Sequence, residues 1–122
     1  MSDVLKIEDR GHVRVIRMVR PEKKNALSLE LAWGVVNAIQ DAAQEESVWV
    51  IGLTGTGDAF CSGLDLSPDP QTQSYTRLNP QDEYLDELGW VSRFPMVLRQ
   101  WCDKPIVGGI NGVAVGAGLG LA

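Results

Sequence analysis

The sequence is poor in cysteine, histidine and positive charge, and each shortage excludes a class of protein. Its 122 residues include two cysteines, Cys61 and Cys102, and a single histidine, His12. This supply is too small for a disulfide framework or a metal-binding spacing, so we expect a reducing, cytoplasmic setting and no bound metal. The formal net charge is −5. An acidic chain lacks the positive face with which proteins bind nucleic acids and anionic membranes.

Long apolar runs are also scarce. The N-terminal segment, MSDVLKIEDRG, lacks the apolar stretch of a signal peptide. The segment 105–122 carries no charge and approaches the length of a membrane-spanning helix. It nevertheless begins with Pro105, contains Asn111 and is interrupted by six glycines. A buried strand followed by the start of a helix fits this segment better than a membrane span does.

What the sequence does contain is typical of one modest globular domain over residues 1–122. Hydrophobic residues make up 44% of the chain and charged residues 22%, a balance at which disorder is not expected. The length suffices for one domain and not for two.

Periodicity predicts the elements of the first half. Apolar and polar residues alternate over residues 4–8 and 13–18, which predicts two antiparallel strands. Ser28 is placed to cap a helix that extends to about residue 46. The apolar positions of this helix recur at helical spacing and are Leu29, Ala32, Val36, Ile39 and Ala43. The continuous apolar segment 48–54 is typical of a strand that is buried on both faces and therefore parallel.

The second half continues this alternation. Residues 67–80 are rich in small and polar residues and predict a surface loop. A helix is expected over residues 81–103, bent or broken at Pro95. Residues 106–110 predict another buried strand, and a further helix is expected to begin near Ala117. The order of strands and helices predicts an α/β fold with right-handed crossovers.

The glycine-rich segment GINGVAVGAGLGLA allows several explanations. It matches a dinucleotide fingerprint only loosely, and no lysine follows Lys104, which excludes a Walker loop. Glycines at the start of a helix also expose backbone N–H groups, which stabilise negative charge on a carbonyl oxygen. The segment FCSGLDL follows another apolar strand and offers a second such donor. Close packing of a helix on a sheet is the plain explanation for any single glycine.

Three blocks of the sequence carry a family resemblance. RPEKKNAL, VIGLTGTGDAFCSGLDL and KPIVGGINGVAVGAGLGLA occur in this order, and together they resemble the enoyl-CoA hydratase/isomerase (crotonase) superfamily over about residues 13–122. The resemblance implies an α/β spiral of ββα units, of which this chain is an N-terminal portion, incomplete at its C-terminus. It also implies an acyl-CoA substrate, no cofactor besides that coenzyme A, and a homotrimer or hexamer.

The resemblance assigns roles to individual residues. The backbone N–H groups of Leu64 and Ala117 correspond to the family's oxyanion hole, which binds the thioester oxygen. The residues that correspond to its coenzyme A contacts are Lys24, Ala26, Ser62, Asp65 and Leu66. Without the resemblance, the leucine would be explained as core and the lysine as part of a solvated loop.

One position departs from the family pattern. Hydratases of the family carry a catalytic glutamate where this chain has Gly120, and glycine cannot transfer a proton. Because one base suffices to move a proton between carbons, we expect an isomerase-like enzyme whose catalytic carboxylate lies beyond residue 122. The alternatives are a non-catalytic acyl-CoA-binding homologue, a hydratase that uses a different acid, and a dinucleotide-binding oxidoreductase. His12 is expected at the surface, and Cys61 is expected to serve in packing.

Overall fold

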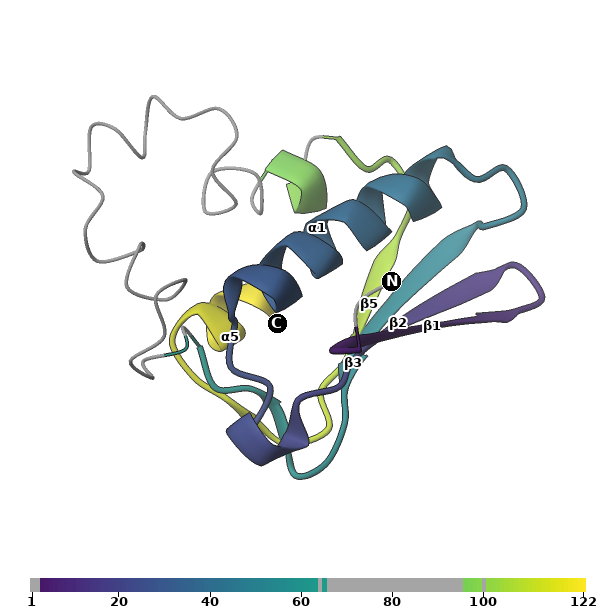
Figure 1. Ribbon diagram of the computed structural model, residues 1–122. Helices are drawn as coiled ribbons and strands as arrows, with labels where there is room; N and C mark the ends of the chain where they lie inside the picture. Colours follow the sequence, from purple (N-terminus) through teal and green to yellow (C-terminus); the bar gives the residue numbers. More distant parts are fainter. Residues whose placement is uncertain (1–2, 64, 66–95, 100) are drawn as a thin grey trace.

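The computed structural model describes residues 3–63, 65, 96–99 and 101–122 (Figure 1). The elements are β1 (Leu5–Arg10), β2 (Val13–Met18), the 3-10 helix η1 (Pro21–Lys23), α1 (Leu29–Gln44), β3 (Val50–Gly55), β4 (Ala59–Cys61), β5 (Ile106–Gly109), β6 (Val113–Ala114) and α5 (Ala117–Leu121). Residues 96–99 are also helical. The loop expected at 67–80 and most of the helix expected at 81–103 lie outside the described residues.

The predicted strands form a four-stranded sheet with the order β1-β2-β3-β5. Strands β1 and β2 are antiparallel, with Ile7 opposite Ile16, whereas β2 pairs with β3, and β3 with β5, in parallel. A parallel neighbour requires a crossover connection, and α1 supplies it between β2 and β3. The structure therefore confirms the predicted hairpin and the parallel character of β3.

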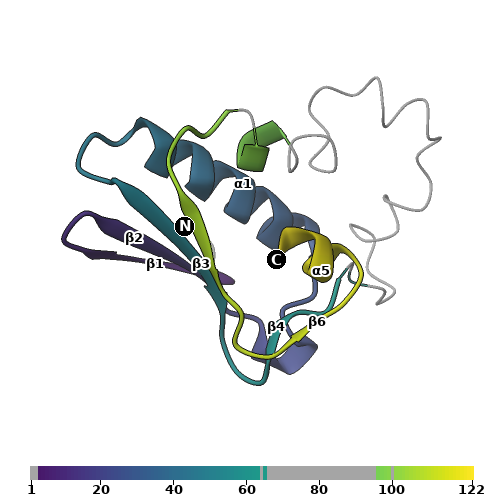
Figure 2. The same cartoon turned by 180° about the vertical axis from the view of Figure 1, so that it is seen from behind.

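Helix α1 lies along one face of this sheet (Figures 1 and 2). It begins where the sequence predicts, because the Ser28 hydroxyl accepts a hydrogen bond from the backbone N–H of Leu31 at 3.2 Å. The buried side of the helix is shifted relative to the predicted stripe, whose end residues Leu29 and Ala43 are only partly buried. The buried residues of α1 are Leu31, Ala32, Val35, Val36, Ala38, Ile39 and Ala42.

Two strands are less buried than predicted. Strand β3 alternates buried and half-buried residues, because α1 covers one face of the sheet and the described residues place no helix over the other. The expected burial of residues 106–110 is also wrong, since Val107 is 58% exposed and Ile110 is exposed as well. Strand β5 is an edge strand, and no element in the described ranges packs against its outer side.

A second, two-stranded sheet brings distant parts of the sequence together. Strands β4 and β6 pair in parallel, with Ala59 opposite Val113 and Cys61 opposite Ala114. Helix α5 follows β6 directly and begins at Ala117, as predicted. Figure 2 shows β4, β6 and α5 beside one another at one end of the molecule. None of the helices in the described part of the chain has the length and apolar character needed to cross a membrane.

Candidate active site

The two glycine-containing turns predicted from the sequence lie against each other beyond the ends of β4 and β6. Gly63 has a φ of +99°, which favours glycine. A Cβ at Gly63 would lie 3.0 Å from the carbonyl oxygen of Val115 and 3.6 Å from the amide nitrogen of Ala117. A side chain therefore does not fit between the turns, and glycine allows them to approach this closely.

The backbone N–H of Ala117 lies at the start of α5. The next three N–H groups along the chain donate to Val115 and Gly116 carbonyl oxygens at 2.9 to 3.1 Å. Within the described ranges, no acceptor bonds to the Ala117 N–H, as is usual for the first residue of a helix. Ala117 as a whole residue is exposed.

The second predicted donor, Leu64, lies outside the described residues, and so does Leu66 among the predicted coenzyme A contacts. The residues on both sides of Leu64 are described. Gly63 accepts a hydrogen bond from the Leu27 N–H at 2.7 Å, and the Asp65 N–H donates to the Leu27 carbonyl oxygen at 3.1 Å. Gly63 and Asp65 are thus both anchored to Leu27, in the segment that precedes α1.

The remaining predicted coenzyme A contacts form one connected patch. The Ser62 N–H donates to the Lys24 carbonyl oxygen at 3.1 Å. The Arg20 guanidinium donates to the Ala26 carbonyl oxygen at 2.6 Å and to the Asp65 carboxylate at 2.9 Å. The structure therefore joins the RPEKKNAL loop to the turn after β4.

Arg20 is a residue of this patch whose importance sequence reasoning missed. The sequence shows it within a basic cluster, next to lysines that attract more attention as phosphate contacts. The signal available in the sequence was the residue type. A guanidinium presents several donors in a fixed geometry, so it can bind a carboxylate and a carbonyl oxygen at the same time. Its partner Asp65 is far along the chain, so the sequence alone does not reveal the pair.

Lys24 adopts a left-handed backbone conformation, with a φ of +50°. Its ammonium group lies 3.1 Å from both carboxylate oxygens of Asp58. The hydrogen bond from Lys24 lowers the pKa of Asp58 below its ordinary value. Both side chains are largely exposed, so a phosphate group that bound Lys24 would compete with Asp58 for it.

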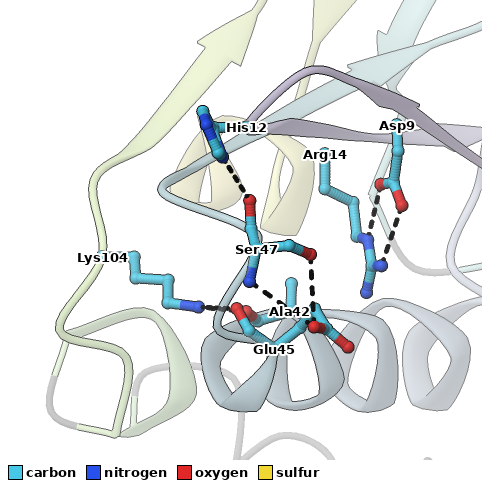
Figure 3. Close-up of polar contacts among 7 residues, drawn as sticks. All are labelled: Asp9, His12, Arg14, Ala42, Glu45, Ser47 and Lys104. Atoms are coloured by element: carbon cyan, nitrogen blue, oxygen red, sulfur yellow. Dashed lines mark hydrogen bonds and ion pairs between the residues drawn. The ribbon is translucent and has the colours of Figure 1, made fainter.

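His12 directly precedes β2, at the end of the sheet where Val13 is opposite Val50, whereas the candidate site follows the other end, where Met18 is opposite Gly55. Figure 3 shows the polar contacts around His12. The His12 Nδ1 donates to the carbonyl oxygen of Ser47 at 2.9 Å, and the imidazole stacks on Trp49 with ring centroids 3.6 Å apart. In the same region the Lys104 ammonium donates to the carbonyl oxygens of Ala42 and Glu45 at 2.7 and 2.6 Å. The Lys104 hydrogen bonds cap the C-terminal end of α1. His12 is exposed, as predicted.

The described residues contain neither a candidate metal site nor a reactive thiol. They contain no group of three or more His, Cys, Asp or Glu side chains that could hold a metal ion. Cys61 is buried, and this burial raises the pKa of its thiol. A thiol held in the neutral form is a poor nucleophile, so the position of Cys61 in β4 is consistent with packing.

Comparison with solved structures assigns the fold. The enoyl-CoA hydratase of Mycobacterium tuberculosis matches with a TM-score of 0.72 and 32% identity, over 98% of this chain and 44% of that one. These values define a crotonase-type α/β chain. The family's own sequence model, described as enoyl-CoA hydratase/isomerase, matches residues 8–122. The chain belongs to the enoyl-CoA hydratase/isomerase family, which confirms the resemblance seen in its motifs.

Individual relatives have different activities in their names. An enoyl-CoA hydratase of Alternaria alternata is 38% identical over 116 residues, which cover 95% of this chain and 35% of the relative. A 4-chlorobenzoyl coenzyme A dehalogenase of an Arthrobacter species is 34% identical over 123 residues, which cover 97% of this chain and 41% of the relative. The chain thus spans less than half of the length of each of these three relatives.

Proposed function

We propose that this chain forms the part of an acyl-CoA enzyme that holds the thioester carbonyl in an oxyanion hole of two backbone N–H groups. The donors are the N–H groups of Leu64 and Ala117. They stabilise the negative charge that develops on the thioester oxygen when a proton leaves the neighbouring carbon. The hydratases and the dehalogenase to which the chain is similar act, by their names, on coenzyme A thioesters, and this supports the substrate class.

The contact between the two turns carries the proposal. Gly63, which directly precedes Leu64, lies against Ala117. Two donors can converge on one oxygen only if the turns that carry them are neighbours, and these turns are. Removal of one donor from such a hole costs about 3–4 kcal/mol of transition-state stabilisation in other enzymes, which is the size of the contribution proposed for each donor.

The coenzyme A moiety is proposed to bind along the patch that joins the RPEKKNAL loop to the turn after β4. Lys24 supplies a positive charge for a phosphate, and the backbone at Ala26, Ser62, Asp65 and Leu66 supplies polar groups for the adenine. The hydrogen bonds between these segments support the proposal, because a preformed surface loses little conformational freedom when it binds.

The reaction is proposed to be isomerisation rather than two-glutamate hydration. Gly120 stands where hydratases that the motif resembles carry a glutamate, and glycine offers no proton-transferring group. A non-catalytic acyl-CoA-binding homologue and a hydratase that uses another acid are the alternatives. We further propose, on the resemblance alone, that the intact protein is a homotrimer or hexamer, which sedimentation velocity would test. A cytoplasmic location is proposed from the low cysteine content.

The proposal is tested by binding and turnover together. Calorimetry with a saturated acyl-CoA, coenzyme A and a nicotinamide dinucleotide is expected to show binding of the first two ligands. With the intact protein, conversion of a 3-enoyl-CoA to its 2-enoyl isomer is expected to exceed hydration of the 2-enoyl-CoA. Acyl-CoA binding without any turnover would favour the non-catalytic homologue. Fast hydration without isomerisation would contradict the preference for an isomerase, and dinucleotide binding alone would contradict the whole proposal.

A further inference from the structure

The side chains of Asn25 and Asn111 both form hydrogen bonds to the segment that connects β3 and β4. The Asn25 amide donates to the carbonyl oxygens of Thr56 at 3.0 Å and Ala59 at 2.9 Å. The Asn111 amide donates to the carbonyl oxygens of Gly57 and Ala59, both at 3.0 Å. The Ala59 carbonyl oxygen therefore accepts a hydrogen bond from each asparagine, and one atom joins three segments that are far apart in the sequence.

Each asparagine uses its whole amide in this arrangement. The Asn25 side-chain oxygen accepts from the Arg20 N–H at 2.8 Å, and the Asn111 side-chain oxygen accepts from the Gly55 N–H at 3.1 Å. An amide supplies two donors and an acceptor, which neither a carboxylate nor an aliphatic side chain reproduces. Asn25 is completely buried and has a left-handed φ of +55°, a conformation that asparagine tolerates better than most residues.

The shared acceptor lies at the start of the β4–β6 pair. Ala59 is opposite Val113, two residues after Asn111. At Gly112, which lies between Asn111 and Val113, the two segments approach so closely that a Cβ would collide with the carbonyl oxygen of Asp58. The far ends of the same two strands lead to the turns that contain Gly63 and Ala117. The register shifts between Ala59 and Cys61, which lies opposite Ala114, so the pairing at Ala59 fixes one end of the short irregular ladder that leads to those turns.

We propose that Asn25 and Asn111 are positioning residues, which align the two donor turns by binding the single carbonyl oxygen of Ala59. This inference rests on the proposed function, because it gives the alignment a catalytic purpose. Asn111 ties β6 to this oxygen, and Asn25 ties the RPEKKNAL loop to it. The asparagines act through the backbone and do not touch the substrate.

The first part of the test needs no ligand. Backbone amide NMR spectra of the chain are compared for wild type, Asn111→Ala and Asn37→Ala, in which the control residue is an exposed asparagine of α1. Asn111→Ala is expected to move the amide resonances of Gly63 and Ala117, while those of β1 stay in place and Asn37→Ala moves none of them. Unmoved Gly63 and Ala117 resonances in Asn111→Ala would overturn the proposal. So would loss of the folded spectrum in both Asn111→Ala and Asn111→Asp, because the residue would then be needed for folding in general.

The second part measures the polarisation of the bound thioester. Infrared difference spectroscopy of a saturated acyl-CoA, labelled with carbon-13 at the thioester carbonyl, reports how far the oxyanion hole lowers the stretching frequency. Asn111→Ala is expected to lose about half or more of this lowering while the Kd changes less than about threefold, since donor alignment acts on the carbonyl and not on uniform binding. If the carbonyl stretching frequency fell as far in Asn111→Ala as in wild type, the positioning role would be overturned and the proposed function would stand. Binding without any lowering in wild type would instead overturn the proposed function.

Discussion

The guanidinium of Arg20 donates to the carboxylate of Asp65 across 2.9 Å and joins two turns that are 45 residues apart in the sequence. Only 13% of the Arg20 side chain and 6% of the Asp65 side chain are exposed. A second guanidinium nitrogen donates to the Ala26 carbonyl oxygen at 2.6 Å. The pair thus connects the loop proposed to bind coenzyme A with the turn proposed to supply an oxyanion donor.

Removal of the Asp65 charge is expected to destabilise the protein strongly. The variant Asp65→Asn keeps the shape of the side chain but leaves a nearly buried guanidinium without this counter-charge, which costs about 3–5 kcal/mol in comparable pairs. Urea denaturation followed by circular dichroism measures the free energy of unfolding. Arg10→Ala is the control, because Arg10 pairs with Glu8 at the surface and its loss is expected to cost less than about 1 kcal/mol. Equal losses in the two variants would show that the Arg20–Asp65 pair contributes little.

A side chain at Gly63 is expected to separate the two donor turns. In Gly63→Ala the Cβ would lie 3.0 Å from the Val115 carbonyl oxygen, and the φ of +99° is unfavourable for alanine. Strain of this kind costs about 1–3 kcal/mol. Gly120→Ala is the matched control, because a Cβ there meets no atom within 4 Å and its effect is expected to stay within about 0.5 kcal/mol. Thermal melts distinguish the two, and equal midpoints would contradict the tight approach of the turns.

Local patterns predicted the elements whose determinants are close together in the sequence. The hairpin of β1 and β2, the cap at Ser28 and the parallel strand β3 depend on neighbouring residues or on apolar runs, and all three are confirmed. The family motifs also predicted which turns would meet. The resemblance assigned Lys24, Ala26 and Ser62 to one ligand, and the structure joins two of them through the hydrogen bond from the Ser62 N–H to the Lys24 carbonyl oxygen.

The contacts proposed to align the two donor turns could not be predicted from neighbouring residues in the sequence. The hydrogen bonds of Asn111 to Gly57 and Ala59 span more than 50 residues, so no pattern of neighbouring residues indicates them. The exposure of Val107 was mispredicted for a related reason. An apolar strand is recognisable from its sequence, but whether another element covers it depends on the arrangement of the whole fold.

Acid is expected to weaken the ion pair at the end of the β1–β2 hairpin. The Arg14 guanidinium donates to the two carboxylate oxygens of Asp9 at 2.7 and 3.0 Å, and this lowers the pKa of Asp9 below its ordinary value of 3.8. A lowered pKa in the folded state means that the pair stabilises the fold above pH 3.8, and that this contribution disappears as the pH falls through the lowered pKa. A carbon-detected NMR titration of the Asp9 carboxyl should give a midpoint below 3.8 in wild type and a higher one in Arg14→Ala. An unchanged midpoint in the variant would contradict the assignment to Arg14.

The Lys24–Asp58 pair is expected to limit the affinity for coenzyme A. Asp58 binds the ammonium group that the proposal assigns to a phosphate, so Asp58→Asn should leave Lys24 free and strengthen binding. Exposed ion pairs contribute little, so the gain in affinity should not exceed about fivefold. Lys24→Ala should weaken binding, and Lys6→Ala, in β1 and paired with Glu8, is the control. Calorimetry with coenzyme A checks all three variants. Weaker binding by Asp58→Asn would contradict the competition.

A carboxylate placed at residue 120 is expected to redirect the chemistry. Because a Cβ at Gly120 meets no atom within 4 Å, a side chain can begin at this position without displacing its neighbours. General acid–base groups contribute about 10²–10⁴-fold, and an unoptimised glutamate should still raise the ratio of hydration to isomerisation by about tenfold. Gly120→Gln is the control, because it has the same size but cannot transfer the proton. Product analysis by liquid chromatography after incubation with 2-enoyl-CoA and 3-enoyl-CoA measures the ratio. If glutamate and glutamine gave the same ratio, the missing acid at this position could not explain the proposed preference for isomerisation.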